Sequence, residues 1–161
     1  MTVADFVTLA DDVVSQMNNK QGGWSKSFQA ERFYSPSPEL KETGKVNCLV
    51  VPADCRISPD NRTEWTFEFD VDVGLLYRAD AKAGENPLTA FDSMMLLVQQ
   101  VCDYWLENRA LNENCPLHPQ NPITFPNGLY IQQHIKEYNQ FTSVIRLTFW
   151  KLTERTMPAN V

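Results

Sequence analysis

Residues 65–75 alternate apolar and polar side chains almost without a break. One alternate set is aromatic or aliphatic and consists of Trp65, Phe67, Phe69, Val71, Val73 and Leu75. The other set consists of Thr66, Glu68, Asp70 and Asp72. Side chains two positions apart on a strand share a face, so this pattern predicts a strand in a sheet with one buried face. We expect the apolar row to face a core, and the acidic row to face water or a charged partner.

Further segments carry the β-branched and aromatic residues that are typical of strands. They cover residues 24–34, 45–51, 129–135 and 141–152. Turn-forming residues within 52–61, among them Pro52 and Pro59, predict the tip of a hairpin. That hairpin leads into the long alternating strand, which we expect to end near residue 77 or 78.

Two segments have the periodicity of helices. The first is Val3–Asn18, and the second begins at Pro87, where a missing N–H is harmless. An apolar stripe at helical spacing then follows at Leu88, Phe91, Met95, Val98, Cys102 and Trp105, with Val101 and Leu106 beside it. The stripe can be interpreted as a core face or as a groove for a partner, and the periodicity favours the core face.

The predicted order is helix, three strands, helix, two strands, which is an α+β fold. We expect one domain over residues 1–161, with two main helices packed on a mixed or mostly antiparallel sheet of about five strands. Residues 109–126 form a long, proline-rich loop, and loops of this length are uncommon unless they are functional. A flexible tail is expected over residues 153–161.

Composition and charge narrow the possible functions. The chain has 43% hydrophobic and 21% charged residues and a net charge of −6, which argues against a broad nucleic-acid surface. No apolar run approaches the ~18 residues of a membrane span. The N-terminal residues lack the basic region of a secretory signal. A protein partner is therefore the expectation.

The cysteines are Cys48, Cys55, Cys102 and Cys115, and no two of them form a C-x-x-C pair. We expect free thiols in a reducing compartment, although spacing alone would permit a disulfide between Cys55 and Cys115. Cys115, His118 and His134 could be metal ligands, but no convincing fourth ligand accompanies them.

Catalytic motifs are not apparent in the sequence. It has no G-x-S-x-G, no phosphate-binding glycine loop and no H-E-x-x-H. Glu68, Asp70 and Asp72 could bind a metal or act in acid catalysis, but no histidine joins them in sequence, which favours a solvated or partner-facing row. We therefore expect neither an enzyme nor a cofactor.

Several segments resemble small neck and tail proteins of long-tailed bacteriophages. They read FQAERFY at 28–34 before a Pro-Glu-Leu turn, VNCLVVP at 46–52, the strand at 67–76, and QFTSVIRLT at 140–148. The likeness extends over residues 3–152, and the length and element order look most like the tail terminator family.

The resemblance implies a structural virion protein of the tail or neck, assembled in the host cytoplasm. It implies a homo-hexameric ring at the head-proximal end of the tail tube, which stops tube polymerisation and joins the tail to the head-side connector. The tube protein and the connector would be its partners, with DNA only passing through the ring and no membrane involved.

In such a ring, Glu68, Asp70 and Asp72 are candidates for an acidic channel wall that repels phosphates. Arg32, Arg78 and Arg146 lie on or beside strands, where they could pair with carboxylates of a neighbouring subunit. The loops 52–62 and 109–126 are candidates for reaching adjacent subunits.

Other functions remain open at this point. A head-closure or adaptor protein, or a minor tail protein, would have the same sequence features. A metal-dependent enzyme using Glu68, Asp70 and Asp72, or a bacterial binding module with an α+β sheet, are more distant alternatives.

Overall fold

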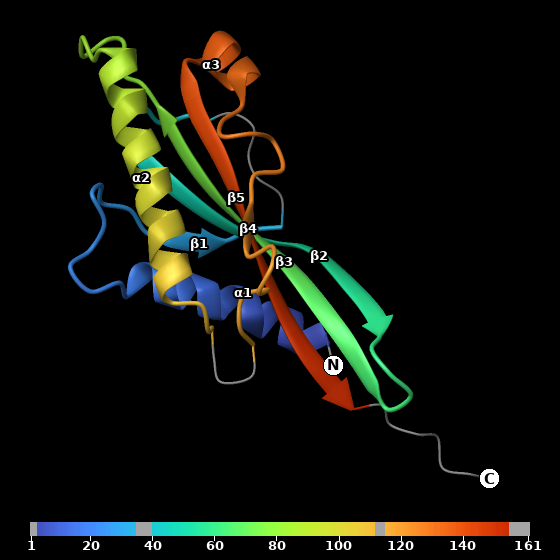
Figure 1. Cartoon of the computed structure of the whole chain (residues 1–161). Coiled ribbons are helices and arrows are strands. Elements are labelled where there is room, and N and C mark those ends of the chain that lie inside the picture. Colours follow the sequence, from blue (N-terminus) through green and yellow to red (C-terminus); the bar gives the residue numbers. More distant parts are fainter. Residues whose placement is uncertain (1–2, 35–39, 112–114, 155–161) are drawn as a thin grey trace.

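The computed structural model describes residues 3–34, 40–111 and 115–154, and it confirms an α+β fold with a mixed sheet (Figure 1). The elements are α1 (Val3–Asn18), β1 (Ala30–Arg32), β2 (Val46–Pro59), β3 (Glu64–Arg78), α2 (Pro87–Glu107), β4 (Ile123–Thr124), α3 (Gln132–Tyr138) and β5 (Gln140–Glu154). The five strands lie in the order β1-β2-β3-β5-β4. Only β1 runs parallel to its neighbour, so the sheet is mostly antiparallel as predicted.

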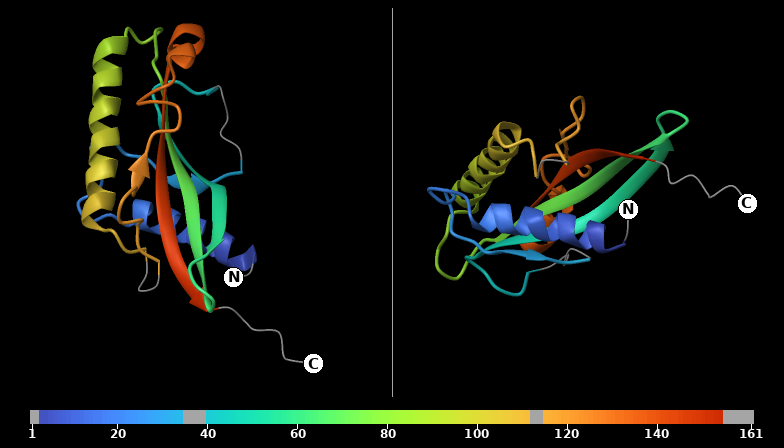
Figure 2. Two further views of the ribbon diagram at one scale, coloured as in Figure 1. Left: turned by 45° about the vertical axis from the view of Figure 1, so that its right-hand side comes forward. Right: turned by 90° about the horizontal axis from the view of Figure 1, so that it is seen from below.

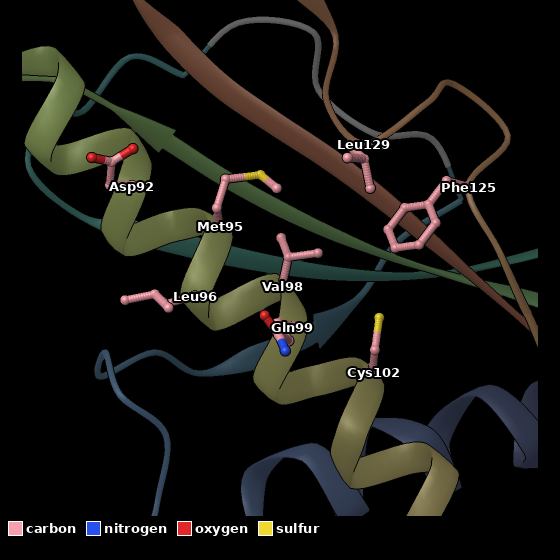
Figure 3. Close-up of a pocket in the computed structure, with 8 residues that line it drawn as sticks. All are labelled: Asp92, Met95, Leu96, Val98, Gln99, Cys102, Phe125 and Leu129. Carbon is pink, nitrogen blue, oxygen red and sulfur yellow. The ribbon is translucent and has the colours of Figure 1, made fainter.

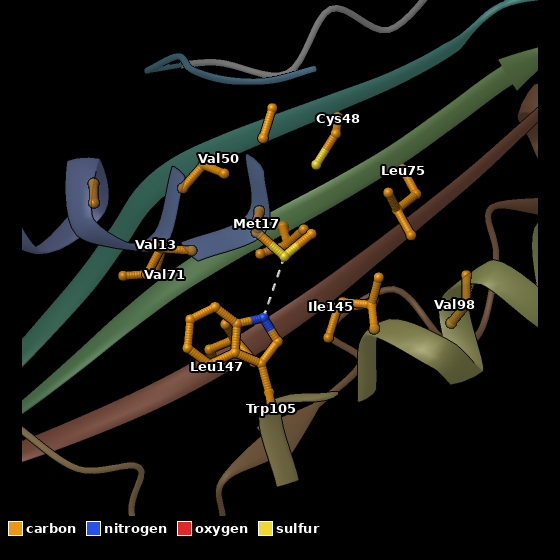
Figure 4. Packing of buried hydrophobic residues seen from close by; sticks show 14 of the residues in the cluster. Val13, Met17, Cys48, Val50, Val71, Leu75, Val98, Trp105, Ile145 and Leu147 are labelled. Atoms are coloured by element: carbon orange, nitrogen blue, oxygen red, sulfur yellow. Dashed lines mark hydrogen bonds between the residues drawn. The ribbon is translucent and has the colours of Figure 1, made fainter. Parts of the chain in front are cut away.

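Helices α1 and α2 cover one face of the sheet, which we call the covered face (Figure 2). The apolar row of β3 lies there, with Val73 and Leu75 fully buried, so the alternation correctly predicted this half of the core. Trp105 of α2 is also fully buried and donates from Nε1 to the Met17 sulfur of α1 at 3.4 Å (Figure 4). The two helices are therefore joined to each other as well as to the sheet.

Helix α2 begins as predicted, because Asn86 caps it by accepting a hydrogen bond from the Leu88 N–H and Pro87 fills the first turn. Its buried face is rotated relative to the predicted stripe and consists of Ala90, Met94, Leu97, Val98, Val101 and Trp105. Leu88 is 70% exposed, and Phe91, Met95 and Cys102 are only half-buried. The predicted stripe was right for Val98, Val101 and Trp105 and wrong for Leu88, while Phe91, Met95 and Cys102 are half-buried and pack against the core.

The first strands differ from the prediction in length. The segment 24–34 contains only the short β1, while β2 continues past residue 51 to Pro59. A register shift between Pro52 and Asp54 accommodates Pro52 inside the strand. The segment 52–61 is therefore mostly strand, and the tight turn follows at residues 60–63. Cys55 lies in this strand and not in a loop.

The C-terminal part also differs from the prediction. The segment 129–135 forms no strand; instead, α3 occupies residues 132–138 and ends at Asn139 in the left-handed conformation, with φ of 51°. β5 pairs with β3 along its whole length and reaches Glu154, so residues 153 and 154 belong to the sheet. Residues 155–161 of the predicted tail lie outside the described residues.

The outer edge of β2 offers few hydrogen-bond donors beyond Val50, where β1 ends. Pro52 and Pro59 have no N–H, and the N–H of Cys55 donates to the carboxylate of Asp54 at 2.8 Å. Prolines, a bulge and local capping are known protections of edge strands against pairing with further strands. This edge is therefore poorly suited to extension of the sheet.

Candidate functional site

The acidic row of β3 lies on the other face of the sheet, which we call the polar face. Cross-strand pairing fixes its neighbours: Glu68 lies opposite Arg56 of β2, while Asp72 and Asp70 lie opposite Arg146 and Thr148 of β5. Each carboxylate therefore has an arginine or a hydroxyl beside it. We call this group, together with His118, the polar-face cluster.

Asp70 is the centre of the polar-face cluster. Its side chain is only 3% exposed, and the guanidinium of Arg56 donates two hydrogen bonds to it, at 2.8 and 3.1 Å. The hydroxyl of Thr148 donates a third at 2.8 Å. The prediction that this row faces water or a partner was therefore wrong for Asp70, which is buried and paired within its own chain.

The flanking carboxylates are also paired. Arg146 donates from Nε and Nη2 to Asp72 at 2.8 and 3.0 Å. Arg56 donates from Nε to Glu68 at 3.1 Å, and Nε2 of His118 lies 3.4 Å from the other oxygen of Glu68. Bidentate arginine pairs of this kind are the strong, directional form of the interaction.

His118 comes from the long segment between α2 and α3, which the structure places along the edge of β5. Its Nδ1 accepts the N–H groups of Gln120 and Asn121, both at 3.2 Å. The backbone of the same segment pairs with Thr148, whose carbonyl accepts from the His118 N–H at 2.7 Å. The predicted loop 109–126 is thus anchored to the sheet and contains β4.

The pairing changes the protonation equilibria of the cluster. Burial by itself would raise the pKa of Asp70, but the hydrogen bonds from Arg56 and Thr148 outweigh it and lower the pKa overall. The hydrogen bond to Asp70 raises the pKa of Arg56, and that to Asp72 raises the pKa of Arg146. At neutral pH the pair Arg56–Asp70 is therefore charged on both sides, and the guanidinium of Arg146 is also charged.

A polar hollow of about 530 Å³ lies over the cluster. It is lined by Arg56, Glu68, Asp70, His118, Gln120, Asn121, Thr124, Arg146 and Thr148. Among the described residues, no three His, Cys, Asp or Glu side chains gather as ligands for a metal ion would. The hollow presents donors and acceptors that already bind one another, which suits a structural role for the cluster.

The other predicted site residues lie elsewhere. Arg32 is at the end of β1 and pairs with Asp11 of α1 at 2.8 Å. Arg78 ends β3 and donates to the Leu40 carbonyl at 2.7 Å. The structure therefore brings Glu68, Asp70, Asp72 and Arg146 together but not Arg32 or Arg78, and all three arginines have partners in their own chain.

The sequence analysis does not single out Arg56 or Thr148, and it considers His118 only as a possible metal ligand with Cys115 and His134. Arg56 was assigned to a turn, and a signal was available: Cys55 and Ile57 flank Arg56 in an alternation that continues the strand past Pro52. For His118 no local signal exists, because its contact with Glu68 depends on the route of a long irregular segment.

An apolar groove lies beside α2 and forms the second candidate site (Figure 3). Met95, Val98 and Cys102 point from the helix toward Phe125 and Leu129 on the segment after β4. The groove has a volume of about 540 Å³ and is also lined by Asp92, Leu96 and Gln99. Burial raises the pKa of Cys102 to about 11, so its thiol is neutral near pH 7.

All four cysteines are free, including Cys55 and Cys115, for which spacing permitted a disulfide. In the described part of the chain, no helix has the length and apolar character needed to cross a membrane. No model of a known protein family matches the sequence, and a comparison with curated proteins finds no significant similarity.

Proposed function

We propose that this chain is a structural protein of a bacteriophage virion, of the tail terminator type. It assembles as a ring on the head-proximal end of the tail tube, stops tube growth, and presents its other side to the head connector. The observation that carries the proposal is the resemblance along residues 3–152, together with an α+β fold of the kind it implies. Neither the protein nor its partners need a cofactor in this role.

The shape of the sheet supports a role in assembly. The hairpin end of β2 and β3, with the end of β5, extends beyond the layer of helices (Figure 2). This end carries exposed apolar side chains on both faces: Ile57, opposite Phe67 on the covered face, is 55% exposed, and Leu152, opposite Thr66 on the polar face, is 43% exposed. An exposed apolar residue at a projecting end can be buried against a neighbouring subunit.

The polar-face cluster changes the details of the channel hypothesis. Arg56 and Arg146 offset part of the charge of Glu68, Asp70 and Asp72. An acidic channel wall would therefore depend on Glu68 and Asp72, because Asp70 is buried. Of the two segments first considered for contacts between subunits, 52–62 forms part of the projecting hairpin end, whereas residues 116–124 of the other segment, 109–126, are paired with β5. The projecting hairpin end is therefore the better candidate.

The test is to assemble tail tubes from the tube protein of the same phage, with and without this protein, and to measure tube lengths by electron microscopy. The proposal predicts rings at one end of each tube and a narrow distribution of lengths. Ile57→Asp should weaken ring formation, whereas Thr43→Asp, which adds the same charge at an exposed position before the other end of β2, should not.

Other outcomes distinguish the alternatives. Binding to head connectors but not to tubes would replace the terminator by a head-closure or adaptor protein. Binding along tubes without any change in their length would indicate a minor tail protein. Binding to neither would contradict a role in the neck and return attention to the enzyme and binding-module hypotheses.

A further inference from the structure

The groove beside α2 has two properties that together define a binding partner. The first property is that the apolar side chains lining the groove are only partly buried within the chain. Met95 and Cys102 are half-buried, while Leu96 is 66% and Leu129 is 51% exposed. Large side chains exposed around a concave surface are uncommon on a monomer without a partner. A groove with these walls fits apolar side chains presented by another element.

The second property is the charge along the helix. The exposed side of α2 carries Asp92, Asp103 and Glu107, and the helix contains no lysine or arginine. Within the described residues, none of these acids forms an ion pair. The opposite wall of the groove, residues 125–131, has no charged residue at all. The charge beside the groove is therefore acidic and uncompensated along the helix.

Basic side chains do lie near α2, but at its ends or on its other flank. Lys82 precedes the helix and Arg109 follows it. Ser25 contacts Gln100 on the flank away from the groove, and Lys20 and Lys26 of that region lie over the rings of Trp24 and Tyr77. They do not neutralise the acidic residues beside the groove.

We propose that the groove between α2 and residues 125–129 is a docking site for a basic amphipathic helix of another protein. The apolar side chains of the partner helix fill the space between Met95, Cys102 and Leu129. The lysines or arginines of the partner helix lie along Asp92 and Asp103. Apolar anchors at helical spacing with a charged rim are the usual means by which a groove binds a helix. This inference goes beyond the proposed function and rests on the groove alone.

The test measures binding of the purified full chain to a fluorescent peptide of about 18 residues, five helical turns, with leucines along one face and lysines elsewhere. A peptide of the same composition with its leucines dispersed around the helix is the control probe. The proposal predicts that the amphipathic peptide binds at least about tenfold more tightly than the dispersed one. Equal binding of the two peptides would overturn it, because affinity would then follow charge alone.

Variants of the protein locate the site. Leu96→Ser with Leu129→Ser removes two exposed apolar contacts and should weaken binding about tenfold, with circular dichroism confirming that the fold is retained. The triple variant Asp92→Asn, Asp103→Asn, Glu107→Gln should weaken it several-fold and reduce its dependence on salt. Its control, Glu31→Gln, Glu42→Gln, Glu137→Gln, makes the same change in net charge at exposed positions elsewhere.

Equal losses in the two triple variants would overturn the proposal, as would undiminished binding by the serine variant. If a variant fails to fold, mapping of amide chemical shifts on the wild-type protein decides instead. Shifts confined to residues 92–102 and 125–129 on addition of the amphipathic peptide would support the site, and shifts centred elsewhere would contradict it. Since no tail tube is involved, this result is independent of the outcome for the proposed function.

Discussion

The two faces of the sheet are built from the same strands but are stabilised differently. On the covered face, β3 and β5 contribute Val73, Leu75 and Ile145 to a core with no exposed surface at these positions. On the polar face, side chains of β3 and β5, together with Arg56 of β2, form the Arg56–Asp70 and Arg146–Asp72 pairs. Apolar packing tolerates many arrangements, whereas bidentate pairs require particular partners at particular positions. Apolar packing therefore dominates the covered face, whereas on the polar face the ion pairs fix the register of the strands beside the buried side chains of Leu76 and Val144.

The largest expected effect is on the covered face. Trp105→Ala removes a fully buried ring and its contact with Met17, and should lower the free energy of unfolding by about 3–5 kcal/mol. The matched change on the polar face is Trp150→Ala, at a half-buried position opposite Glu68, where we expect about 1 kcal/mol. Urea unfolding followed by circular dichroism measures both. Similar losses for the two would contradict the division between the faces.

The second prediction concerns the pair at the centre of the polar face. Arg56→Met leaves the carboxylate of Asp70 buried with only Thr148 as a donor, and should destabilise the fold by about 2 kcal/mol. Adding Asp70→Asn removes the unpaired charge, so the double variant should be more stable than Arg56→Met alone.

The pair of Arg32 with Asp11 provides the control for these variants of Arg56 and Asp70, because both of its side chains are partly exposed to water. Arg32→Met should lower the free energy of unfolding far less than Arg56→Met does, because solvent screens the exposed pair. A double variant in the central pair that loses the full sum of its single effects would show that Arg56 and Asp70 act independently.

This difference also explains which parts of the fold the sequence predicts. The covered face follows from β3 and α1, whose apolar periodicity has one interpretation. The same kind of prediction is less accurate for α2, because Leu88, Leu96 and Leu106 place apolar residues on the exposed side of this helix as well. The hydrophobic pattern then predicts a helix correctly but identifies its buried face only in part, because it includes Val98, Val101 and Trp105 and omits Ala90, Met94 and Leu97.

The polar face is harder to predict because its pairs depend on register. Asp70 and Asp72 are evident as an acidic row, but their partners are 14 and 74 residues away along the chain. A proline in β2 suggested a turn, so Arg56 was placed outside the sheet. Once the register shift at Pro52 is known, the position of Arg56 beside Glu68 follows directly.

The third prediction uses acid to weaken the polar face selectively. The folded-state pKa of Asp70 is lowered, so its pairing contributes stability above the unfolded pKa near 3.9 and loses it as pH falls through the lower folded value. Asp70→Asn should therefore be less stable than wild type at pH 7, by about 1 kcal/mol, and the difference should shrink below about pH 4. Thermal unfolding at a series of pH values measures it, and a difference that widens in acid would contradict the assignment.

The smallest effects come from two hydroxyls of β5, one on each face. Thr148 donates to Asp70 on the polar face, so Thr148→Val should cost about 1 kcal/mol. Ser143 lies opposite Leu75 on the covered face, fully buried, and its hydroxyl has no hydrogen-bond partner among the described residues. Ser143→Ala should leave stability unchanged or raise it by up to about 1 kcal/mol, because it removes a desolvated polar group and little volume. Both substitutions delete one hydroxyl from the same strand, and urea unfolding measures the change in the free energy of unfolding for each. Changes of opposite sign would show that hydroxyl hydrogen bonds stabilise the polar face and not the covered face. A loss on Ser143→Ala as large as that on Thr148→Val would mean that the covered face also depends on a specific hydrogen bond.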